Sequence, residues 1–186
     1  MTLIAILDDY NHAALRMADW SGLQKRCQVD VIDRPLVVPD EAAKVLQPYD
    51  VLCHLRERTA MPRALIEQLP NLKMMAITGH DHRTMDMAAV RDHGIVVSSS
   101  APQPGGAQGT PELTFALMLA AVRHVAFEDA RMRAGHWQST IGTCLNGRTL
   151  GIVGLGKIGQ RVAVIAQAFG MQVVAWSPNL TDERAA

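Results

Sequence analysis

The chain has 186 residues, and its 18 basic and 18 acidic side chains give a formal net charge of zero at pH 7. This balance lacks the basic footprint of a nucleic-acid-binding protein. Apolar residues make up 48% of the chain, enough for a sizeable core. The longest apolar run, Leu113–Val122, is about half of what a membrane span needs, and no signal peptide is visible. We expect neither a nucleic-acid nor a membrane partner.

Three cysteines, Cys27, Cys53 and Cys144, are widely spaced and form no CxxC pattern. An odd, scattered set of this kind is typical of the reducing cytoplasm, with the thiols packed as small hydrophobes. We therefore expect a cytoplasmic protein.

The first hundred residues alternate between short apolar strands and helices. Strands are predicted at Leu3–Leu7, Val29–Ile32, Val51–Leu55, Lys73–Thr78 and Ile95–Val97. Helices are predicted at His12–Trp20, Asp40–Leu46 with Asp40 as its cap, Pro62–Leu69, and Met85–His93 ending at Gly94. This alternation predicts an α/β fold with a parallel sheet covered on both faces.

The segment Ser98–Gly109 interrupts this alternation with twelve residues rich in Ser, Pro, Gly and Gln. Such a composition cannot hold a core, so it predicts a crossover between a first domain, 1–100, and a second, 101–186.

A long helix is predicted to follow the crossover. Thr110, Pro111 and Glu112 form a favourable helix start, with Thr110 at the N-cap. The helix should continue to about Arg133, and its apolar stripe consists of Leu113, Leu117, Ala120 and Ala121. A helix of this length is expected to pack between domains or between subunits.

A glycine motif, Gly154-Leu-Gly-Lys-Ile-Gly159, lies between a predicted strand, Thr149–Val153, and a predicted helix, Gln160–Phe169. A second strand, Gln172–Trp176, follows. The order strand, glycine turn, helix is the context that a dinucleotide-binding GxGxxG motif requires. The sequence therefore predicts the beginning of a Rossmann domain.

Each glycine of the motif has a mechanical role. Gly154 forms the tight turn, Gly156 lets a pyrophosphate approach the backbone, and Gly159 lets the helix pack against the strand. The helix N-terminus would then receive the diphosphate. Lys157 and Ile158 are placed in the glycine loop with their amides toward the pyrophosphate; a solvent-facing lysine is the alternative for Lys157.

The end of the second strand bears on the choice of cofactor. A carboxylate is usual there to bind the adenosine ribose of NAD, but this chain has Ser177 and Pro178. Neither a repelling carboxylate nor an arginine for a 2′-phosphate is present at this position. We expect NAD, with NADP also possible.

Taken together, the motifs resemble the D-isomer-specific 2-hydroxyacid dehydrogenases, a family that includes glyoxylate/hydroxypyruvate reductases and phosphoglycerate dehydrogenases. The resemblance runs along nearly the whole chain. It rests on Arg56–Thr59, Leu72–Gly79, Asp86, Gly94–Val97, Glu112–Leu119, Gly135–Trp137, Leu150–Gly159 and Phe169–Met171.

The resemblance implies a flavodoxin-like substrate domain followed by a Rossmann domain, with hydride transfer between the nicotinamide and a small 2-hydroxy or 2-keto acid. It also implies a homodimer through the helix at 111–133. The family's catalytic histidine, glutamate and arginine lie beyond the second Rossmann strand, so no catalytic residue is assigned in this chain. We expect an N-terminal portion of a longer enzyme that is catalytically silent by itself.

Three substrate-binding candidates follow predicted strands at their carboxyl ends, where ligands bind parallel sheets. In the family, backbone amides at the position of Gly79 and His80 meet the substrate carboxylate; an ordinary loop is the alternative. Arg56 could attract the same carboxylate, and a solvated ion pair is the alternative. His80 and His82 have metal-ligand spacing but no third ligand nearby, so we expect no metal.

Two other functions remain open. The same fold occurs in a non-catalytic, nicotinamide-sensing corepressor, which would lack the catalytic triad beyond this chain. A Rossmann hydrolase of the adenosylhomocysteinase type is disfavoured by the segments Arg56–Thr59 and Gly135–Trp137.

Overall fold

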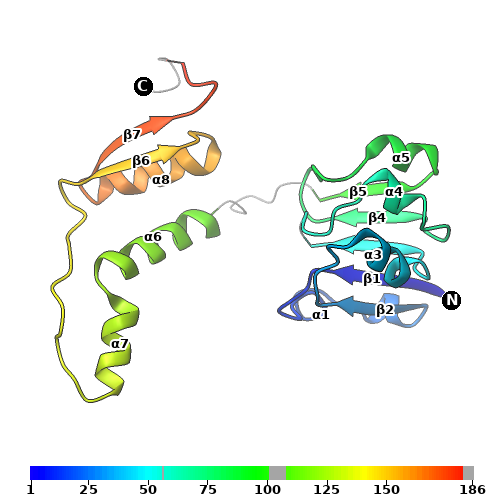
Figure 1. Ribbon diagram of the computed structural model, residues 1–186, viewed down its shortest axis with the longest axis horizontal. Coiled ribbons are helices and arrows are strands. Elements are labelled where there is room, and N and C mark those ends of the chain that lie inside the picture. Colours follow the sequence, from blue (N-terminus) through cyan, green and yellow to red (C-terminus); the bar gives the residue numbers. More distant parts are fainter. Residues whose placement is uncertain (56, 101–107, 182–186) are drawn as a thin grey trace. The chain divides into compact units, whose positions relative to one another are not determined.

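The computed structural model describes residues 1–55, 57–100 and 108–181. The chain divides into two compact units, Met1–Pro102 and Gln103–Ala186 (Figure 1). The predicted α/β class and the parallel pairing of the strands are confirmed in both. Arg56 and residues 101–107 of the predicted crossover lie outside the described residues.

The described residues of the first unit form one five-stranded parallel sheet. Its strands are β1 (Thr2–Leu7), β2 (Cys27–Ile32), β3 (Val51–His54), β4 (Met74–Ile77) and β5 (Val96–Ser99). The order β2-β1-β3-β4-β5 is that of flavodoxin-like folds. Leu7 is in register with Ile32 on one side and with His54 on the other, so the carboxyl ends of these strands share one edge.

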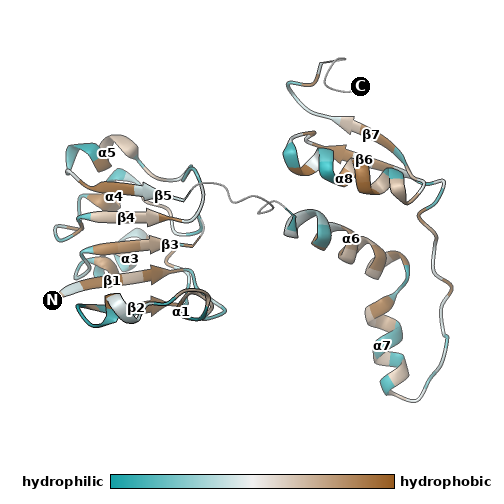
Figure 2. Ribbon diagram, turned by 180° about the vertical axis from the view of Figure 1, so that it is seen from behind, coloured by the Kyte–Doolittle hydropathy of each residue, from teal (hydrophilic) through white to brown (hydrophobic). Residues whose placement is uncertain are grey.

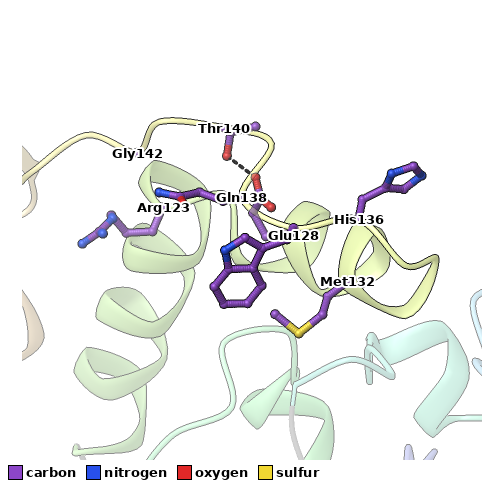
Figure 3. A pocket seen from close by; sticks show the side chains of 8 residues that line it. Arg123, Glu128, Met132, His136, Gln138, Thr140 and Gly142 are labelled. Carbon is purple, nitrogen blue, oxygen red and sulfur yellow. Dashed lines mark hydrogen bonds between the residues drawn. The ribbon is translucent and has the colours of Figure 1, made fainter.

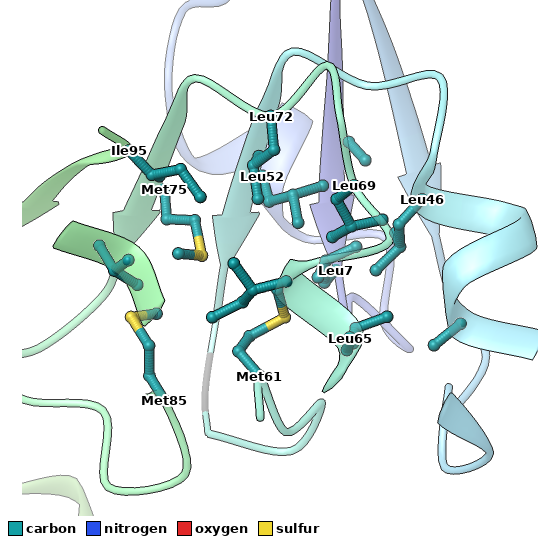
Figure 4. Close-up of a cluster of buried hydrophobic side chains, with 14 of the residues drawn as sticks. Leu7, Leu46, Leu52, Met61, Leu65, Leu69, Leu72, Met75, Met85 and Ile95 are labelled. Carbon is teal, nitrogen blue, oxygen red and sulfur yellow. The ribbon is translucent and has the colours of Figure 1, made fainter. Parts of the chain in front are cut away.

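One face of this sheet holds the main core of the unit. The helices of the first unit are α1 (Ala14–Met17), α2 (Ser21–Gln24), α3 (Pro39–Leu46), α4 (Arg63–Ile66) and α5 (Met87–Asp92). Figure 4 shows Leu7, Leu52 and Met75 of the strands packed together with Leu46 of α3 and Leu65 of α4. Alternate strand residues reach this face because side chains of a strand point to opposite sides in turn.

The opposite face of the sheet is less completely covered. Val51, Cys53 and Met74 are half-buried there, and Val96 is exposed. The prediction of helices over both faces is therefore only partly met within the described residues.

The helix predicted over His12–Trp20 is present but shorter, as α1, and a second short helix, α2, follows the predicted range. The Asp9 carboxylate accepts hydrogen bonds from the amides of Ala13 and Ala14, which fixes the start of α1. The chain then turns, and the Asp19 side chain accepts from the Ser21 amide to start α2.

In its described residues, 108–181, the second unit contains a two-stranded parallel sheet and three helices. They are α6 (Gly109–Val122), α7 (Val125–Arg133), β6 (Thr149–Val153), α8 (Lys157–Ala168) and β7 (Gln172–Trp176). Phe115 of α6 packs with Val162 and Ala166 of α8, and its ring stacks on Phe169 with 5.3 Å between centroids. Figure 2 shows apolar residues along α6 and the strands.

The helix predicted to run continuously from Thr110 to about Arg133 is interrupted at Arg123 and His124. His124 has φ +54° in the left-handed region and separates α6 from α7. The Thr143 amide donates to the carbonyl of Val122, which the break leaves without a helical partner, at 2.8 Å. No glycine or proline marks this break in the sequence, so local patterns gave no warning.

Two predicted helix caps are also wrong. Proline suits the first helical position, so α3 begins one residue before Asp40, with Val38 as N-cap. The helix α6 begins before Thr110, with Gln108 as N-cap, and the Thr110 carbonyl accepts from the Thr114 hydroxyl. Both residues therefore lie in first turns and cap nothing.

The ends of the predicted crossover belong to regular structure. Ser98 and Ser99 extend β5, in register with Ala76 and Ile77 of β4. At the other end, Gly109 already lies in α6. Pairing across the sheet thus overrides the local composition. Within the described residues, no helix is long and apolar enough to cross a membrane.

Candidate active site

The loop that follows β4, Thr78–Met85, is the 78–85 loop and carries two of the predicted substrate residues. The Thr78 hydroxyl donates to the carbonyl of Leu55, beyond the end of β3, at 2.6 Å. Gly79 has φ +117°, a conformation that favours glycine, and its amide donates to the Ser100 hydroxyl at 2.8 Å. These bonds tie the loop to the segments following β3 and β5.

A cavity of about 380 Å³ lies at this edge. It is lined by Glu57, Thr78, Gly79, His80, Asp81 and Arg83. The structure thus brings Gly79 and His80 together beside charges of both signs. Arg56, the third candidate, lies outside the described residues, so its position relative to them is not described.

A buried carboxylate that sequence analysis missed fixes the neighbouring segment. Asp8 follows β1, adopts φ +62° and is buried. Its carboxylate accepts from the amide and the hydroxyl of Thr59, both at 3.1 Å, and from the Tyr10 hydroxyl. The Arg58 guanidinium donates to the Asp8 carbonyl and lies over the Tyr10 ring. The acidic pair directly after the first strand was the available signal.

The glycine turn of the second unit joins β6 to α8. Gly154 has φ +100°, which accounts for glycine at the turn. A Cβ on Gly159 would collide with the Gly154 carbonyl oxygen and approach the Ile152 side chain at 3.3 Å. At Gly156, by contrast, a Cβ would meet no atom within 4 Å. The backbone there is open to an approaching ligand.

The predicted position of Lys157 and Ile158 in the loop needs correction. Helix α8 begins at Lys157, because Gly156 is its N-cap and its carbonyl accepts from the Gln160 amide at 2.9 Å. Lys157 and Ile158 are both exposed in the first turn. First-turn amides have no partner within their helix, so this N-terminus fits a diphosphate.

Ser177 lies at the same edge of the small sheet as the glycine turn. The Gly154 amide donates to the carbonyl of Trp176, the last residue of β7, at 2.7 Å. Ser177 therefore follows directly opposite the turn. It is half-buried, Pro178 is exposed, and the Ser177 carbonyl accepts from the Leu180 amide in a turn. Cofactor candidates from two strands are thus neighbours.

A further pocket lies between α7 and the loop after it (Figure 3). The Glu128 carboxylate accepts from the Thr140 hydroxyl at 2.6 Å and from Ser139, and these bonds hold its pKa below the usual value. Met132 and Trp137 line the pocket and are exposed. No prediction from sequence included this pocket.

No group of three or more histidine, cysteine, aspartate or glutamate side chains suited to a metal ion occurs among the described residues. The three cysteines are free thiols.

Comparison with known proteins gives two matches in series along the chain. Residues 4–114 match the model of the D-isomer specific 2-hydroxyacid dehydrogenase catalytic domain. Residues 115–186 match the model of the NAD binding domain of the same family.

Curated relatives point the same way. The chain is 34% identical over 166 residues to a D-3-phosphoglycerate dehydrogenase of Bacillus subtilis, covering 88% of this chain and 31% of that protein. It is 37% identical over 142 residues to a hydroxypyruvate reductase of Thermotoga maritima, covering 75% and 45%. The chain therefore spans less than half the length of either relative.

Solved structures agree in fold as well as in sequence. A phosphoglycerate oxidoreductase from Vibrio cholerae O395 superimposes with a TM-score of 0.84 at 34% identity, covering all of this chain and 59% of that one. A putative D-3-phosphoglycerate dehydrogenase from Ralstonia solanacearum gives the same TM-score at 36% identity, with 57% of its chain covered.

Proposed function

Since the chain belongs to the D-isomer specific 2-hydroxyacid dehydrogenase family, we propose that its protein transfers a hydride between NAD and a small 2-hydroxy or 2-keto acid. The observation that carries the proposal is the match of both family domains, in order, over residues 4–186. In this proposal the first predicted domain, 1–100, binds the acid, and the second, 101–186, begins the cofactor domain.

The 78–85 loop supplies the substrate contacts in this proposal. Gly79 and His80 present their backbone to the substrate carboxylate, and the Arg56 guanidinium adds attraction of opposite charge. The Gly79 amide already donates to Ser100, so the hydroxyl of Ser100 must rotate or share that donor when the acid binds. No residue of the chain is assigned to the proton transfer.

The glycine turn holds the cofactor in the same proposal. Gly154 and Gly159 fix the turn, while the backbone at Gly156 and the first-turn amides of Lys157 and Ile158 receive the diphosphate. NAD, when bound, supplies the hydride acceptor or donor. Ser177 and Pro178 lie at the strand end that meets the adenosine ribose, where the absence of a carboxylate leaves NADP as a second cofactor.

The test is activity of the complete protein. Absorbance at 340 nm would follow NADH or NADPH oxidation with glyoxylate and with hydroxypyruvate. We expect turnover with at least one of the two acids, and Gly79→Val, which strains the loop at φ +117°, to reduce it strongly. Turnover no greater than in buffer, with both cofactors and both acids, would contradict the proposal.

We also propose that the protein is a homodimer through α6 and α7. Leu113 and Leu117 of the predicted stripe are exposed, Leu117 by 62%, as are Phe127 and Met132 of α7. Apolar helix faces of this kind are typical of subunit interfaces. Sedimentation velocity of the complete protein at micromolar concentration should give a dimer.

A matched pair of variants tests where the dimer forms. Leu117→Asp should shift the protein toward the monomer, whereas Leu23→Asp, at an exposed leucine of α2, should leave the dimer intact. A monomeric wild type would refute the dimer, and equal effects of both variants would refute this interface.

We further propose that the protein acts in the cytoplasm. The free thiols of Cys27, Cys53 and Cys144 support this location, because thiols stay reduced there.

A further inference from the structure

In the middle of the 78–85 loop, one side chain, that of His82, is buried. From Thr78 to Thr84, every residue is exposed except His82, which is 5% exposed. The loop's ends are fixed by backbone bonds, from the Thr78 amide to the His54 carbonyl and from the Met61 amide to the Thr84 carbonyl. Between these ends, the Gly79 amide donates to the Ser100 hydroxyl, and His82 supplies the buried side chain.

The buried partner of His82 is a second histidine. His54, the last residue of β3, is 1% exposed, and its ring lies edge-on to that of His82, with 4.9 Å between centroids and 88° between planes. Within the described part of the chain, both ring nitrogens of His54 and the Nε2 of His82 have no hydrogen-bond partner, while the His82 Nδ1 is 3.4 Å from the Thr84 hydroxyl. The contact is thus between two rings packed as apolar groups.

We propose that the His54–His82 contact is an acid-sensitive latch that holds the 78–85 loop on the end of β3. His54 can occupy this site as a neutral imidazole, but its charged form would be buried with no partner among the described residues to stabilise it. Opening the loop exposes the rings to water and relieves that penalty. The proposal concerns the loop's conformation and stands whether or not the loop binds an acid.

The electrostatics of the site support this reading. Burial, followed by the nearby His82, lowers the pKa of His54 from 6.5 to about 3. The register neighbours of His54 are Leu7 and Ile77, which are apolar. Among the residues that the structure describes, the charged and titratable groups of the adjoining segments are exposed or hydrogen-bonded elsewhere: Asp8, Glu57, Arg58, His80, Asp81 and Arg83.

The direction of the pH effect follows from the lowered pKa. The closed loop binds fewer protons than the open loop between pH 3 and pH 6.5, so closure is fully stabilised above pH 6.5 and is lost as the pH falls. If His54 regains its ordinary pKa in the open state, the open population rises about 30-fold from pH 7.5 to pH 5.0.

Hydrogen exchange of the full chain tests the latch. The amides of Gly79 and Met85 are hydrogen-bonded when the loop is closed, to Ser100 and to the His82 carbonyl. After correction for the intrinsic pH dependence of exchange, their protection should fall about 30-fold from pH 7.5 to pH 5.0. Unchanged protection would overturn the proposal.

Two variants separate the latch from a general acid effect. In the double variant His54→Leu, His82→Leu, apolar rings are replaced by apolar side chains, so the pH response should disappear. The control His80→Asn removes an exposed histidine of the same loop and should keep the response. A response that persists in the double variant overturns the latch.

A nuclear magnetic resonance titration keeps the test decisive if the double variant fails to fold. In the folded wild-type chain, the closed-state His54 imidazole should remain neutral well below pH 6.5. An imidazole that titrates near pH 6.5 without any change in loop protection would overturn the proposal.

Discussion

The two units share the alternation of apolar strands and helices but bury their strands to different extents. In the first unit, Leu7, Leu52 and Met75 are fully buried beneath α3, α4 and α5. In the second, Val153 at the end of β6 is 84% exposed and Trp176 at the end of β7 is 63% exposed. The run of apolar residues determines that a strand forms, whereas the burial of that strand depends on the neighbouring elements.

The two edges also fix their loops by different means. Side-chain hydrogen bonds of Asp8 and Thr78 hold the loops of the first unit. The turn in the second unit depends on the backbone of Gly154 and on the missing Cβ of Gly159. Substitutions should therefore act through lost contacts in one unit and through introduced collisions in the other.

The largest effect is expected from the core of the first unit. Leu52→Ala removes a completely buried side chain and should lower the free energy of unfolding of this unit by about 2–5 kcal/mol. Val174→Ala, on the exposed part of β7, should change that of the second unit by less than about 0.5 kcal/mol. Urea unfolding monitored by residue-resolved exchange would measure both, and similar losses would contradict the contrast.

Acid should also distinguish the units. The lowered pKa of His54 means that its contribution to stability is complete above pH 6.5 and is lost progressively toward pH 3. The first unit should therefore lose about 2 kcal/mol between pH 7.5 and pH 5.0. The described histidines of the second unit, His124 and His136, are exposed. An equal loss of stability in the second unit would therefore contradict His54 as the cause.

The glycine turn provides a matched pair of variants within the second unit. Gly159→Ala drives a Cβ into the Gly154 carbonyl and should destabilise the unit by about 1–3 kcal/mol. Gly156→Ala meets open space and should keep the fold while weakening NADH binding, because the Cβ occupies the ligand's approach. Calorimetric titration with NADH and thermal unfolding would tell them apart; destabilisation by Gly156→Ala would weigh against this assignment.

The smallest effect concerns cofactor choice. Ser177→Asp introduces a carboxylate opposite Gly154. This carboxylate would accept hydrogen bonds from the ribose hydroxyls and repel a 2′-phosphate. A charge-assisted hydrogen bond of about 1.5–3 kcal/mol should shift the NAD/NADP ratio of kcat/KM by about tenfold or more in the complete protein. An unchanged ratio would show that Ser177 does not face the ribose.

Local patterns sufficed where the signal is carried by adjacent residues. The strands Thr149–Val153 and Gln172–Trp176 have the predicted bounds, and Gly94 has φ +63° just after α5. Each of these features depends on a run of apolar residues or on one glycine conformation. The interruption at His124, where the Val122 carbonyl accepts from the Thr143 amide of a later loop, was missed.

The candidate site divides in the same way. The glycine turn and the 78–85 loop were found from sequence because a strand end and its loop are contiguous. The contacts that anchor the edge of the first unit, Asp8 with Thr59 and His54 with His82, were missed because they join distant segments. Whether Gly79, His80 and Ser177 contact ligands stays a prediction.

The sequence alone determined the α/β class, the family and the place of the dinucleotide motif, since all three follow from ordered local patterns and their spacing. Tertiary structure decided where α6 ends, which residues hold the 78–85 loop and how deeply each strand is buried. A buried hydrogen bond or ring contact depends on which segments meet across the sheet. That meeting is fixed by strand order and register, which no single stretch of sequence contains.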